Sequence, residues 1–317
     1  MKSIATLTLN PAIDGACEAQ KVGPTHKIRT RNDRYNPGGG GINVARVVQR
    51  LGGKALAVYM AGGATGGVMD SLLDDHQIDR RRIDIAGHTR ISLNVHERTS
   101  GLEYRFVPEG PEVSAAEVQA CIDAVNDISC DYLVISGSLP RGIPIDLYAR
   151  LAVMAAKRGA RVVLDTSGPA LGTALKGGNI FLVKPSRGEM EKLVSRPLPI
   201  ISDIENAAID LIQAERCENI VVTLGHEGAV LVHKGGAFRL PALPVNTSSA
   251  VGAGDSFVGG MVFALASGSS MDEAFRLGLA AATATVLSPG TDLCQKSDVK
   301  RLLGQVPPAP TSMPANP

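Results

Sequence analysis

Short apolar runs alternate with helix-like segments along most of this chain, and no other feature constrains its fold as strongly. Apolar runs of strand length occupy 4–9, 55–61, 132–135, 162–164, 180–183 and 220–224. Helix starts of the capping-box type, in which a serine precedes a glutamate by three residues, occur at Ser114, Ser202 and Ser270. Strands that alternate with helices form a mainly parallel sheet with helices on both faces. The chain is therefore predicted to be an α/β protein whose ligands bind beyond the carboxyl ends of the strands.

One segment departs from this alternation. Between Ile91 and Val107, apolar and polar residues alternate on both sides of a turn at Arg98–Gly101. That pattern predicts an antiparallel hairpin rather than a strand–helix unit. The stretch from Cys17 to Tyr35 also lacks helical periodicity and is predicted to add further strands. Such a hairpin is either a plain surface feature or part of a lid over a binding site.

A cluster of small residues, Val251–Ser256, leads directly into an apolar helical pattern over Phe257–Ala266. The unpaired N–H groups at a helix N-terminus attract anions, and glycines let a large anion approach the backbone closely. Asp255 then stands in the first turn of this helix. Its carboxylate either caps the helix or, beside a phosphate, accepts a proton from an attacking hydroxyl.

A second glycine cluster, Gly38–Gly41, precedes apolar residues at helical spacing from Ile42 to Leu51. Four consecutive glycines suit a flexible linker. A linker does not usually open into an amphipathic helix, however, whereas a loop that lets a ligand touch main chain does. We therefore interpret this cluster as a second ligand-binding loop.

These two glycine motifs stand in the order typical of a known family, together with Thr8–Asp14, Ile135–Pro140 and Lys184–Pro185 before Glu189. The chain resembles the ribokinase-like sugar kinases, in particular the PfkB subgroup, from Ile4 to about Leu303. The resemblance implies a ribokinase-like three-layer α/β/α domain over 1–306, with lid strands inserted from about 15–35 and 88–107. Lids of this family often pair, so a homodimer through the lid is expected. A disordered Pro-rich tail is predicted over 307–317.

The resemblance assigns the chemistry to the second motif. Asp255 would be the catalytic base, and the backbone N–H groups of Gly252, Ala253 and Gly254 would bind the transferring phosphate. The sugar would be bound by Asp14, Gly38, Gly39, Gly40, Gly41, Asn43 and Ser138. Lys27 and Arg90 match positions that bind the substrate phosphate, with Arg29 and Arg105 as weaker candidates. Taken singly, each of these cations is equally explained as a solvated surface charge, and Asp14 as a turn residue.

The resemblance places the nucleotide on Lys184, Ser186, Thr223, Gly225 and Gly228, and Mg²⁺ near Glu189, through water. Ser186 stands where the family carries asparagine, which weakens any direct contact assigned to it. The alternative for Glu189 is an ordinary first-turn glutamate.

Some relatives also bind K⁺, and the corresponding residues are Ser249, Val251, Ser288 and Gly290. Two departures, Ala250 for threonine and Asp292 for arginine, leave the dependence on monovalent ions open.

Composition excludes several classes of function. The net charge is +1, the chain has no Trp, and aromatic residues make up 3% of it. These values disfavour a nucleic-acid partner. The apolar stretch 277–287 is too short to span a bilayer, so no membrane partner is expected. Five scattered cysteines without a CxxC pair suit a reducing cytoplasm.

The expected activity is therefore that of an ATP-dependent sugar-phosphate kinase. Fructose 6-phosphate, converted to fructose 1,6-bisphosphate, is the favoured ketohexose phosphate. Tagatose-6-phosphate kinase and 1-phosphofructokinase activities remain close alternatives, because few contacts separate related furanoses. A non-catalytic sensor of a sugar phosphate and a nucleotide is the alternative of another class.

Overall fold

A nine-stranded sheet forms the centre of the molecule, with the order β13-β12-β11-β10-β9-β8-β1-β4-β5. The computed structural model describes residues 1–308 of the chain. The strands from β5 to β11 run parallel, and β12 and β13 add an antiparallel edge. In chain order these strands are β1 (Ile4–Thr8), β4 (Leu56–Gly62), β5 (Arg80–Ile85), β8 (Tyr132–Ser136), β9 (Arg161–Asp165), β10 (Leu182–Val183), β11 (Asn219–Thr223), β12 (Ala229–His233) and β13 (Gly236–Leu240).

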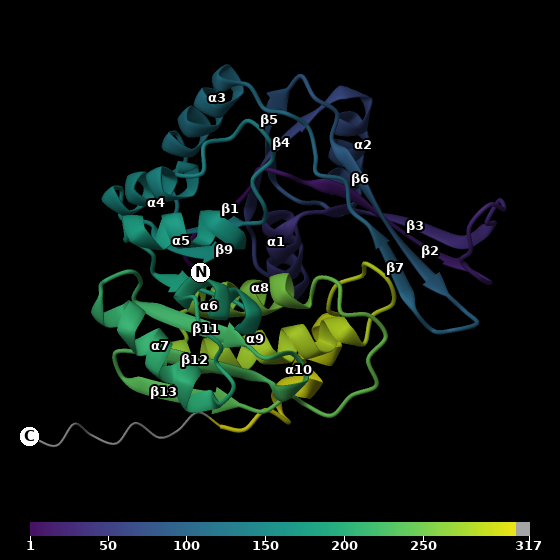
Figure 1. Cartoon of the computed structure of the whole chain (residues 1–317). Coiled ribbons are helices and arrows are strands. Elements are labelled where there is room, and N and C mark those ends of the chain that lie inside the picture. The colour runs from purple at the N-terminus through teal and green to yellow at the C-terminus, as the bar shows by residue number, and fades with distance from the viewer. Residues whose placement is uncertain (309–317) are drawn as a thin grey trace, which may run out of the picture.

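Helices cover both faces of this sheet (Figure 1). Two separate apolar cores result, one on each face, because the buried strands present side chains to both sides. One core is covered by α1 (Gly40–Leu51), α2 (Gly63–Asp75), α8 (Ala253–Ala266), α9 (Met271–Val286) and α10 (Lys296–Leu303). The other is covered by α3 (Ala115–Asn126), α4 (Leu147–Lys157), α5 (Gly168–Gly177), α6 (Arg187–Val194) and α7 (Ile201–Gln213). The short helix η1 (Gly225–Glu227) joins β11 to β12.

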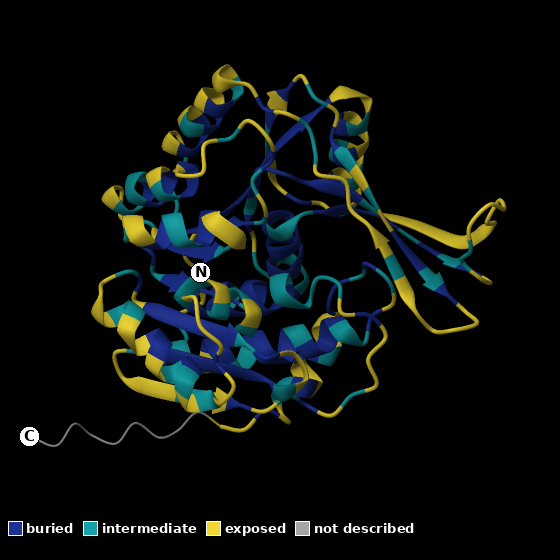
Figure 2. Ribbon diagram, in the orientation of Figure 1, coloured by how far each residue is buried: buried dark blue, intermediate teal, exposed yellow. Residues whose placement is uncertain are grey.

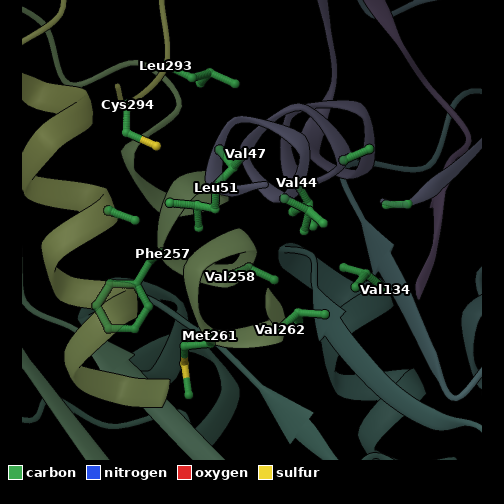
Figure 3. Packing of buried hydrophobic residues seen from close by; sticks show 14 of the residues in the cluster. Val44, Val47, Leu51, Val134, Phe257, Val258, Met261, Val262, Leu293 and Cys294 are labelled. Atoms are coloured by element: carbon green, nitrogen blue, oxygen red, sulfur yellow. The ribbon is translucent and has the colours of Figure 1, made fainter. Parts of the chain in front are cut away.

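The helix α8 is buried between α1 and α9 (Figures 2 and 3). Its glycines permit this close approach. A Cβ atom on Gly259 would lie 2.7 Å from Val47, and one on Gly260 would lie 2.9 Å from the carbonyl oxygen of Leu277. Phe257 packs against Phe275 of α9, with ring centroids 5.8 Å apart. The position of α8, and of Asp255 in its first turn, is therefore fixed by backbone-level contact.

A separate four-stranded sheet projects from one side of the molecule (Figure 1). We call this sheet the lid. Its order is β3-β2-β6-β7, and its strands are β2 (Ala12–Ala19), β3 (Thr30–Gly38), β6 (Arg90–Glu97) and β7 (Glu103–Phe106). The strands β6 and β7 form the antiparallel hairpin that the alternating pattern predicts. The two segments 12–38 and 90–106 meet through a parallel pairing of β2 with β6.

Most helix and strand predictions are confirmed, and one helix start is wrong. The capping boxes at Ser114 and Ser270 are present, with reciprocal serine and glutamate hydrogen bonds. The one expected at Ser202 is not formed, because α7 already begins at Ile201, which packs against the core. Ser202 thus lies inside the first turn rather than before it. A capping box that the sequence analysis did not identify begins α6 at Ser186.

Residues 309–317 of the predicted disordered tail lie outside the described part of the chain. Within residues 1–308, no helix combines the length and apolar character needed to cross a bilayer.

Candidate active site

The residues singled out from the sequence converge at the carboxyl edge of the parallel sheet. Ser138 follows β8, Asp165 ends β9, Lys184 follows β10, and Thr223 ends β11. Parallel strands bring their carboxyl ends to one edge, where an α/β sheet binds its ligands. The N-termini of α1 and α8 reach the same edge, because Asn43 of α1 contacts Asp255 of α8.

Asp255 is the third residue of α8, after the cap Gly252. Gly252 has φ 75°, a left-handed conformation that favours glycine. The Asn43 Nδ2 donates a hydrogen bond of 2.8 Å to Asp255 Oδ2. Burial raises the Asp255 pKa to about 7, with the Asp165 charge adding to this, while the Asn43 hydrogen bond and Lys184 lower it. A carboxylate poised near neutral pH suits a general base.

Lys184 supplies a buried cation at the same helix end. Its Nζ lies 3.1 Å from Asp165 Oδ1, and the two side chains are only 7% and 14% exposed. A Cβ atom on Gly254 would lie 3.4 Å from this Nζ, so the ammonium group rests against the first turn of α8. Burial opposes the charge of Lys184, but Asp165 raises the lysine pKa. Burial likewise raises the Asp165 pKa, and Lys184 counters this.

Asp14 lies on the inner face of the lid, directly over Gly38. A Cβ atom at residue 38 would overlap the Asp14 carboxylate, so this position requires glycine. Burial raises the Asp14 pKa to about 6, and the charges of Arg46, Arg90 and Arg105 lower it. A cavity beside this carboxylate is further lined by Ser92, Asn94, Arg105, Val251 and Thr291. The cavity thus joins the lid to the loop that precedes α8.

Arg90 is held in place before any ligand binds. Its guanidinium donates to the carbonyl oxygens of Asn10 and Pro108, each at 2.8 Å. Asn10 Nδ2 in turn donates to Ser138 Oγ at 3.2 Å, which brings Ser138 into the same cluster. The Arg90 Nε is buried and lacks a hydrogen-bond partner within residues 1–308. An unpaired buried donor of this kind suits an anionic ligand.

Lys27 is not brought into this cluster. It is exposed in the loop after Ala19, whereas Arg90 pairs with Ala12 at the opposite end of β2. At a strand rise of about 3.3 Å per residue, these ends are separated by roughly 20 Å. Arg29 lies exposed in the same distal loop. Lys27 and Arg90 of one chain therefore do not form a single phosphate site.

The first glycine cluster packs directly on two strand ends. A Cβ atom on Gly41 would lie 2.6 Å from Thr8 Oγ1, which also accepts a 3.0 Å hydrogen bond from the Ile42 N–H. Side chains at Gly39 and Gly40 would likewise contact Thr8 and Ser136. The glycines thus let α1 begin at the edge of the sheet, beside Asp14.

The segments expected to bind nucleotide lie side by side. Thr223 N–H donates to the Pro185 carbonyl oxygen at 3.0 Å, and Ser186 forms a bridge with Thr223. Gly225 and Gly228 shape the turn that follows, both with positive φ. Ser186 is the N-cap of α6 and exchanges hydrogen bonds with Glu189. Because asparagine and serine are both preferred N-caps, the departure at Ser186 preserves the helix start.

Two loops near the lid contain the residues expected to bind K⁺. Ser249 and Ser288 are buried, and Ser248 and Gly290 line one cavity. Ser288 Oγ donates to the Leu293 carbonyl oxygen at 3.1 Å. The departure at Asp292 is accommodated by the lid, because Arg34 approaches its carboxylate at 3.5 Å.

The sequence analysis did not assign several residues that the structure brings to this site. Asp165 was expected at the carboxyl end of a strand, but its pairing with Lys184 was not, because β9 and β10 become neighbours only in the sheet. Ser92 and Asn94 were identified only as the polar side of a hairpin. Arg46 was not singled out, although it follows the glycine cluster in a helix whose buried residues are otherwise apolar apart from Asn43. An arginine among buried helix positions is the one signal that points to it.

Comparisons with known proteins agree with this geometry. The sequence model described as pfkB family carbohydrate kinase matches residues 8–298. The chain is 41% identical to ATP-dependent 6-phosphofructokinase isozyme 2 of Escherichia coli (strain K12), over 95% of this chain and 98% of that protein. It is 32% identical to a 1-phosphofructokinase of Borreliella burgdorferi, over 96% of this chain and 97% of that one.

Solved structures show the same similarity. Phosphofructokinase-2 from Escherichia coli in complex with potassium matches with a TM-score of 0.92 and 40% identity. The same protein in complex with fructose-6-phosphate, and in a tetrameric inhibited form, matches with a TM-score of 0.91 and 39% identity. Each comparison covers 96% of this chain and 99% of the other.

Proposed function

The chain belongs to the pfkB family of carbohydrate kinases, and from this premise we propose that it is an ATP-dependent 6-phosphofructokinase. One observation carries the proposal. A carboxylate with a pKa near 7 and a buried ammonium group share the N-terminus of α8, beside a lid that carries Asp14 and Arg90. The lower identity to the 1-phosphofructokinase favours fructose 6-phosphate over fructose 1-phosphate.

In the proposed reaction, the oxygen of the sugar 1-hydroxyl attacks the γ-phosphorus of ATP, and Asp255 accepts the proton of that hydroxyl. The new oxygen–phosphorus bond forms while the bond to the β-phosphate oxygen breaks, and ADP leaves. The N–H groups of Gly252, Ala253 and Gly254, together with Lys184, stabilise the negative charge on the transferring group. Asp14 orients the sugar, and Arg90 binds its 6-phosphate. The nucleotide lies against Ser186, Thr223, Gly225 and Gly228.

The residues near Glu189 fit a magnesium ion bound through water. The capping hydrogen bonds of Ser186 both use Glu189 Oε2, so Oε1 is the oxygen that would accept from a metal-bound water. When bound with ATP, the ion neutralises phosphate charge. The hydroxyl oxygens of Ser249 and Ser288 and the carbonyl oxygens of Val251 and Gly290 are neutral ligands of the kind that suits a monovalent cation, and we propose that K⁺ binds there, with Glu103 Oε2 3.5 Å from Ser249 Oγ.

A coupled assay of ADP release tests the assignment. Fructose 6-phosphate, fructose 1-phosphate, tagatose 6-phosphate and fructose are compared, in K⁺ and in tetramethylammonium buffers. We expect the highest kcat/KM with fructose 6-phosphate. A preference for another phosphate would support the alternative kinase activities. Saturable binding of sugar phosphate and nucleotide without ADP release would instead support the sensor.

Arg90→Ala is expected to raise KM for the sugar phosphate and to leave KM for ATP nearly unchanged. The change removes a charge-assisted contact to one substrate only, worth about 1.5–3 kcal/mol, or roughly ten- to a hundredfold in affinity. Arg98→Ala is the matched control, because Arg98 is an exposed lid arginine near the end of the same strand. Equal increases in both KM values would place Arg90 outside the sugar-phosphate site.

We further propose a homodimer in which two lids pair through their outer faces. One row across the lid is apolar and exposed: Tyr35 is 58% exposed, Leu93 37% and Phe106 56%, with Gly15 between Tyr35 and Leu93. Ile91 extends the row and is also exposed. Val95, expected on this face, is instead buried beside Cys17, Ala19 and Tyr104. In such a dimer we expect Lys27, which is exposed in the loop between β2 and β3, to contribute to the partner subunit's sugar-phosphate site.

Leu93→Asp is expected to shift the protein toward monomer and to raise KM for the sugar phosphate. An unpaired carboxylate in an apolar interface is costly, by about 3–5 kcal/mol. Analytical ultracentrifugation and kinetics measure both effects. Leu102→Asp is the control, since Leu102 is 58% exposed but lies in the turn after β6, outside the row. A wild-type monomer, or an unchanged Leu93→Asp dimer, would contradict lid pairing.

We also propose a cytoplasmic location, which the cysteines support. All five are free, and four of them are buried. Unpaired thiols of this kind persist in a reducing compartment.

A further inference from the structure

Arg46 of α1 is a buried cation that the proposed reaction does not yet use. It is 2% exposed, which makes it one of the largest fully buried side chains. Its guanidinium donates to the Pro37 carbonyl oxygen at 3.0 Å, to Asn43 Oδ1 at 3.1 Å and to Asn36 Oδ1 at 2.9 Å. All three acceptors are neutral. A buried charge whose hydrogen-bond acceptors are all neutral is costly, so the position of Arg46 calls for a function.

The Asn43 amide connects Arg46 to the proposed base. Its Oδ1 accepts from Arg46 Nη1, while its Nδ2 donates to Asp255 Oδ2 at 2.8 Å. The opposite amide orientation would turn the NH₂ group toward the guanidinium and the oxygen toward the carboxylate. Both contacts would then be repulsive. Arg46 therefore selects the one orientation in which Asn43 donates to Asp255.

We propose that Arg46 is a positioning residue for phosphoryl transfer: by fixing the Asn43 amide, it holds Asp255 by one oxygen and leaves the other for the acceptor hydroxyl. This inference rests on the proposed kinase function for the role of Asp255. The hydrogen bond from Asn43 also favours the charged form of the carboxylate, which is the form that accepts a proton.

The same guanidinium fixes the inner end of the lid strand β3. Arg46 Nη2 donates to Asn36 Oδ1, and Asn36 Nδ2 donates to Thr291 Oγ1 at 3.0 Å. Thr291 lines the cavity beside Asp14. One buried side chain thus joins the lid, the loop 288–292 and the base.

Several charged groups act on Asp255 from the elements around it. Asp165 at the end of β9 and Asp14 of β2 raise its pKa, Lys184 after β10 lowers it, and Arg46 of α1 interacts with it favourably. Asp255 must be ionised to act as a base, so activity is present above its pKa and is lost as pH falls through it. Removing Arg46 removes a favourable charge and frees the amide. The acid limb of the profile, which is the fall of kcat toward low pH, should then move to higher pH.

The test compares kcat against pH for wild type, Arg46→Met, Arg46→Lys and Arg50→Met. For Arg46→Met we expect the acid limb to move up by about one pH unit, with kcat at neutral pH reduced about tenfold. Arg46→Lys keeps the positive charge but loses the planar guanidinium with its several fixed donors. We therefore expect kcat to fall severalfold, with a smaller shift of the acid limb. Arg50 lies one turn later and, among residues 1–308, its side chain donates to the carbonyl oxygens of Leu293 and Cys294 alone. Arg50→Met should therefore leave the acid limb at its wild-type pH.

A folded Arg46→Met variant with a wild-type acid limb would overturn the inference. If Arg46→Met does not fold, Arg46→Lys provides the test instead. A wild-type kcat together with a wild-type acid limb in Arg46→Lys would also overturn the inference. A second measurement does not need turnover: the Asp255 carboxyl is titrated by NMR with ¹³C-labelled aspartate, and Asp255→Asn identifies its signal. An upward shift of the Asp255 pKa in the Arg46 variants supports the positioning role even if the wild-type protein releases no ADP. Absence of ADP release would contradict only the proposed function. An unchanged titration in an active enzyme would defeat only the role of Arg46.

Discussion

Asp255→Asn should lower kcat by on the order of 10²–10⁴, the usual contribution of a general base, while the fold and ligand binding persist. The asparagine is isosteric, and its side-chain oxygen still accepts the hydrogen bond from Asn43 Nδ2. The variant therefore loses proton acceptance rather than packing. Steady-state kinetics with the sugar phosphate and ATP measure the effect, and thermal unfolding shows whether the fold is retained.

Asp272→Asn is the matched control for this change. Asp272 also stands in the first turn of a helix, α9, where it approaches His233 at 3.2 Å. Both substitutions replace an aspartate in the first turn of a helix, the third residue of α8 and the second residue of α9, so their effects on the helix dipole are comparable. Only Asp255→Asn should reduce kcat. A wild-type kcat in Asp255→Asn would show that Asp255 is not the base and only stabilises the start of the helix.

Lys184→Met should impair both stability and catalysis. The substitution leaves Asp165 buried without its partner, which costs about 3–5 kcal/mol of unfolding free energy. It also removes the cation that rests against the first turn of α8, so kcat should fall by on the order of 10²–10³. Urea unfolding and steady-state kinetics of the same preparation separate the two losses.

The double variant Asp165→Asn/Lys184→Met distinguishes these two effects. Without the carboxylate there is no uncompensated buried charge, so most of the lost stability should return. The catalytic loss should remain, because the ammonium group is still missing. Recovery of both stability and kcat in the double variant would show that Lys184 acts only through the fold.

The arrangement of strands and helices was largely predictable because each element depends on local pattern. The apolar runs 4–9 and 132–135 became β1 and β8, and the alternation after Ile91 became the lid hairpin. The helix start predicted at Ser202 was wrong because a serine three residues before a glutamate can also occur inside a helix. Here the helix already begins at Ile201, which packs against the core. Periodicity carries no information about which of two such starts the core favours.

The polar interior of the site was less predictable, because its partners are remote in the chain. Lys184 and Asp165 meet only because β9 and β10 are neighbours in the sheet. Arg46 meets Asn36 only because β3 ends beside α1. Burial of Val95 was also missed, since alternation assigns a residue to a face but not the loop that covers it. Pairings of this kind depend on tertiary contacts that a local pattern does not contain.

The glycine contacts of α8 have a consequence for how this architecture acquires new substrates. Because Gly259 and Gly260 place α8 against its neighbours at backbone distance, the helix cannot shift without steric overlap. The proposed sugar-binding residues Asp14 and Arg90, in contrast, belong to the lid, a sheet whose outer edge strand β3 is exposed along most of its length (Figure 2). Mutations in the exposed part of β3, residues 30–35, can therefore reshape the outer lid without touching Asn36, which Arg46 connects to Asp255 through Asn43. The outer lid and the helix that carries the proposed base are thus separate parts of the chain, so selectivity for the sugar can diverge while α8 stays in place.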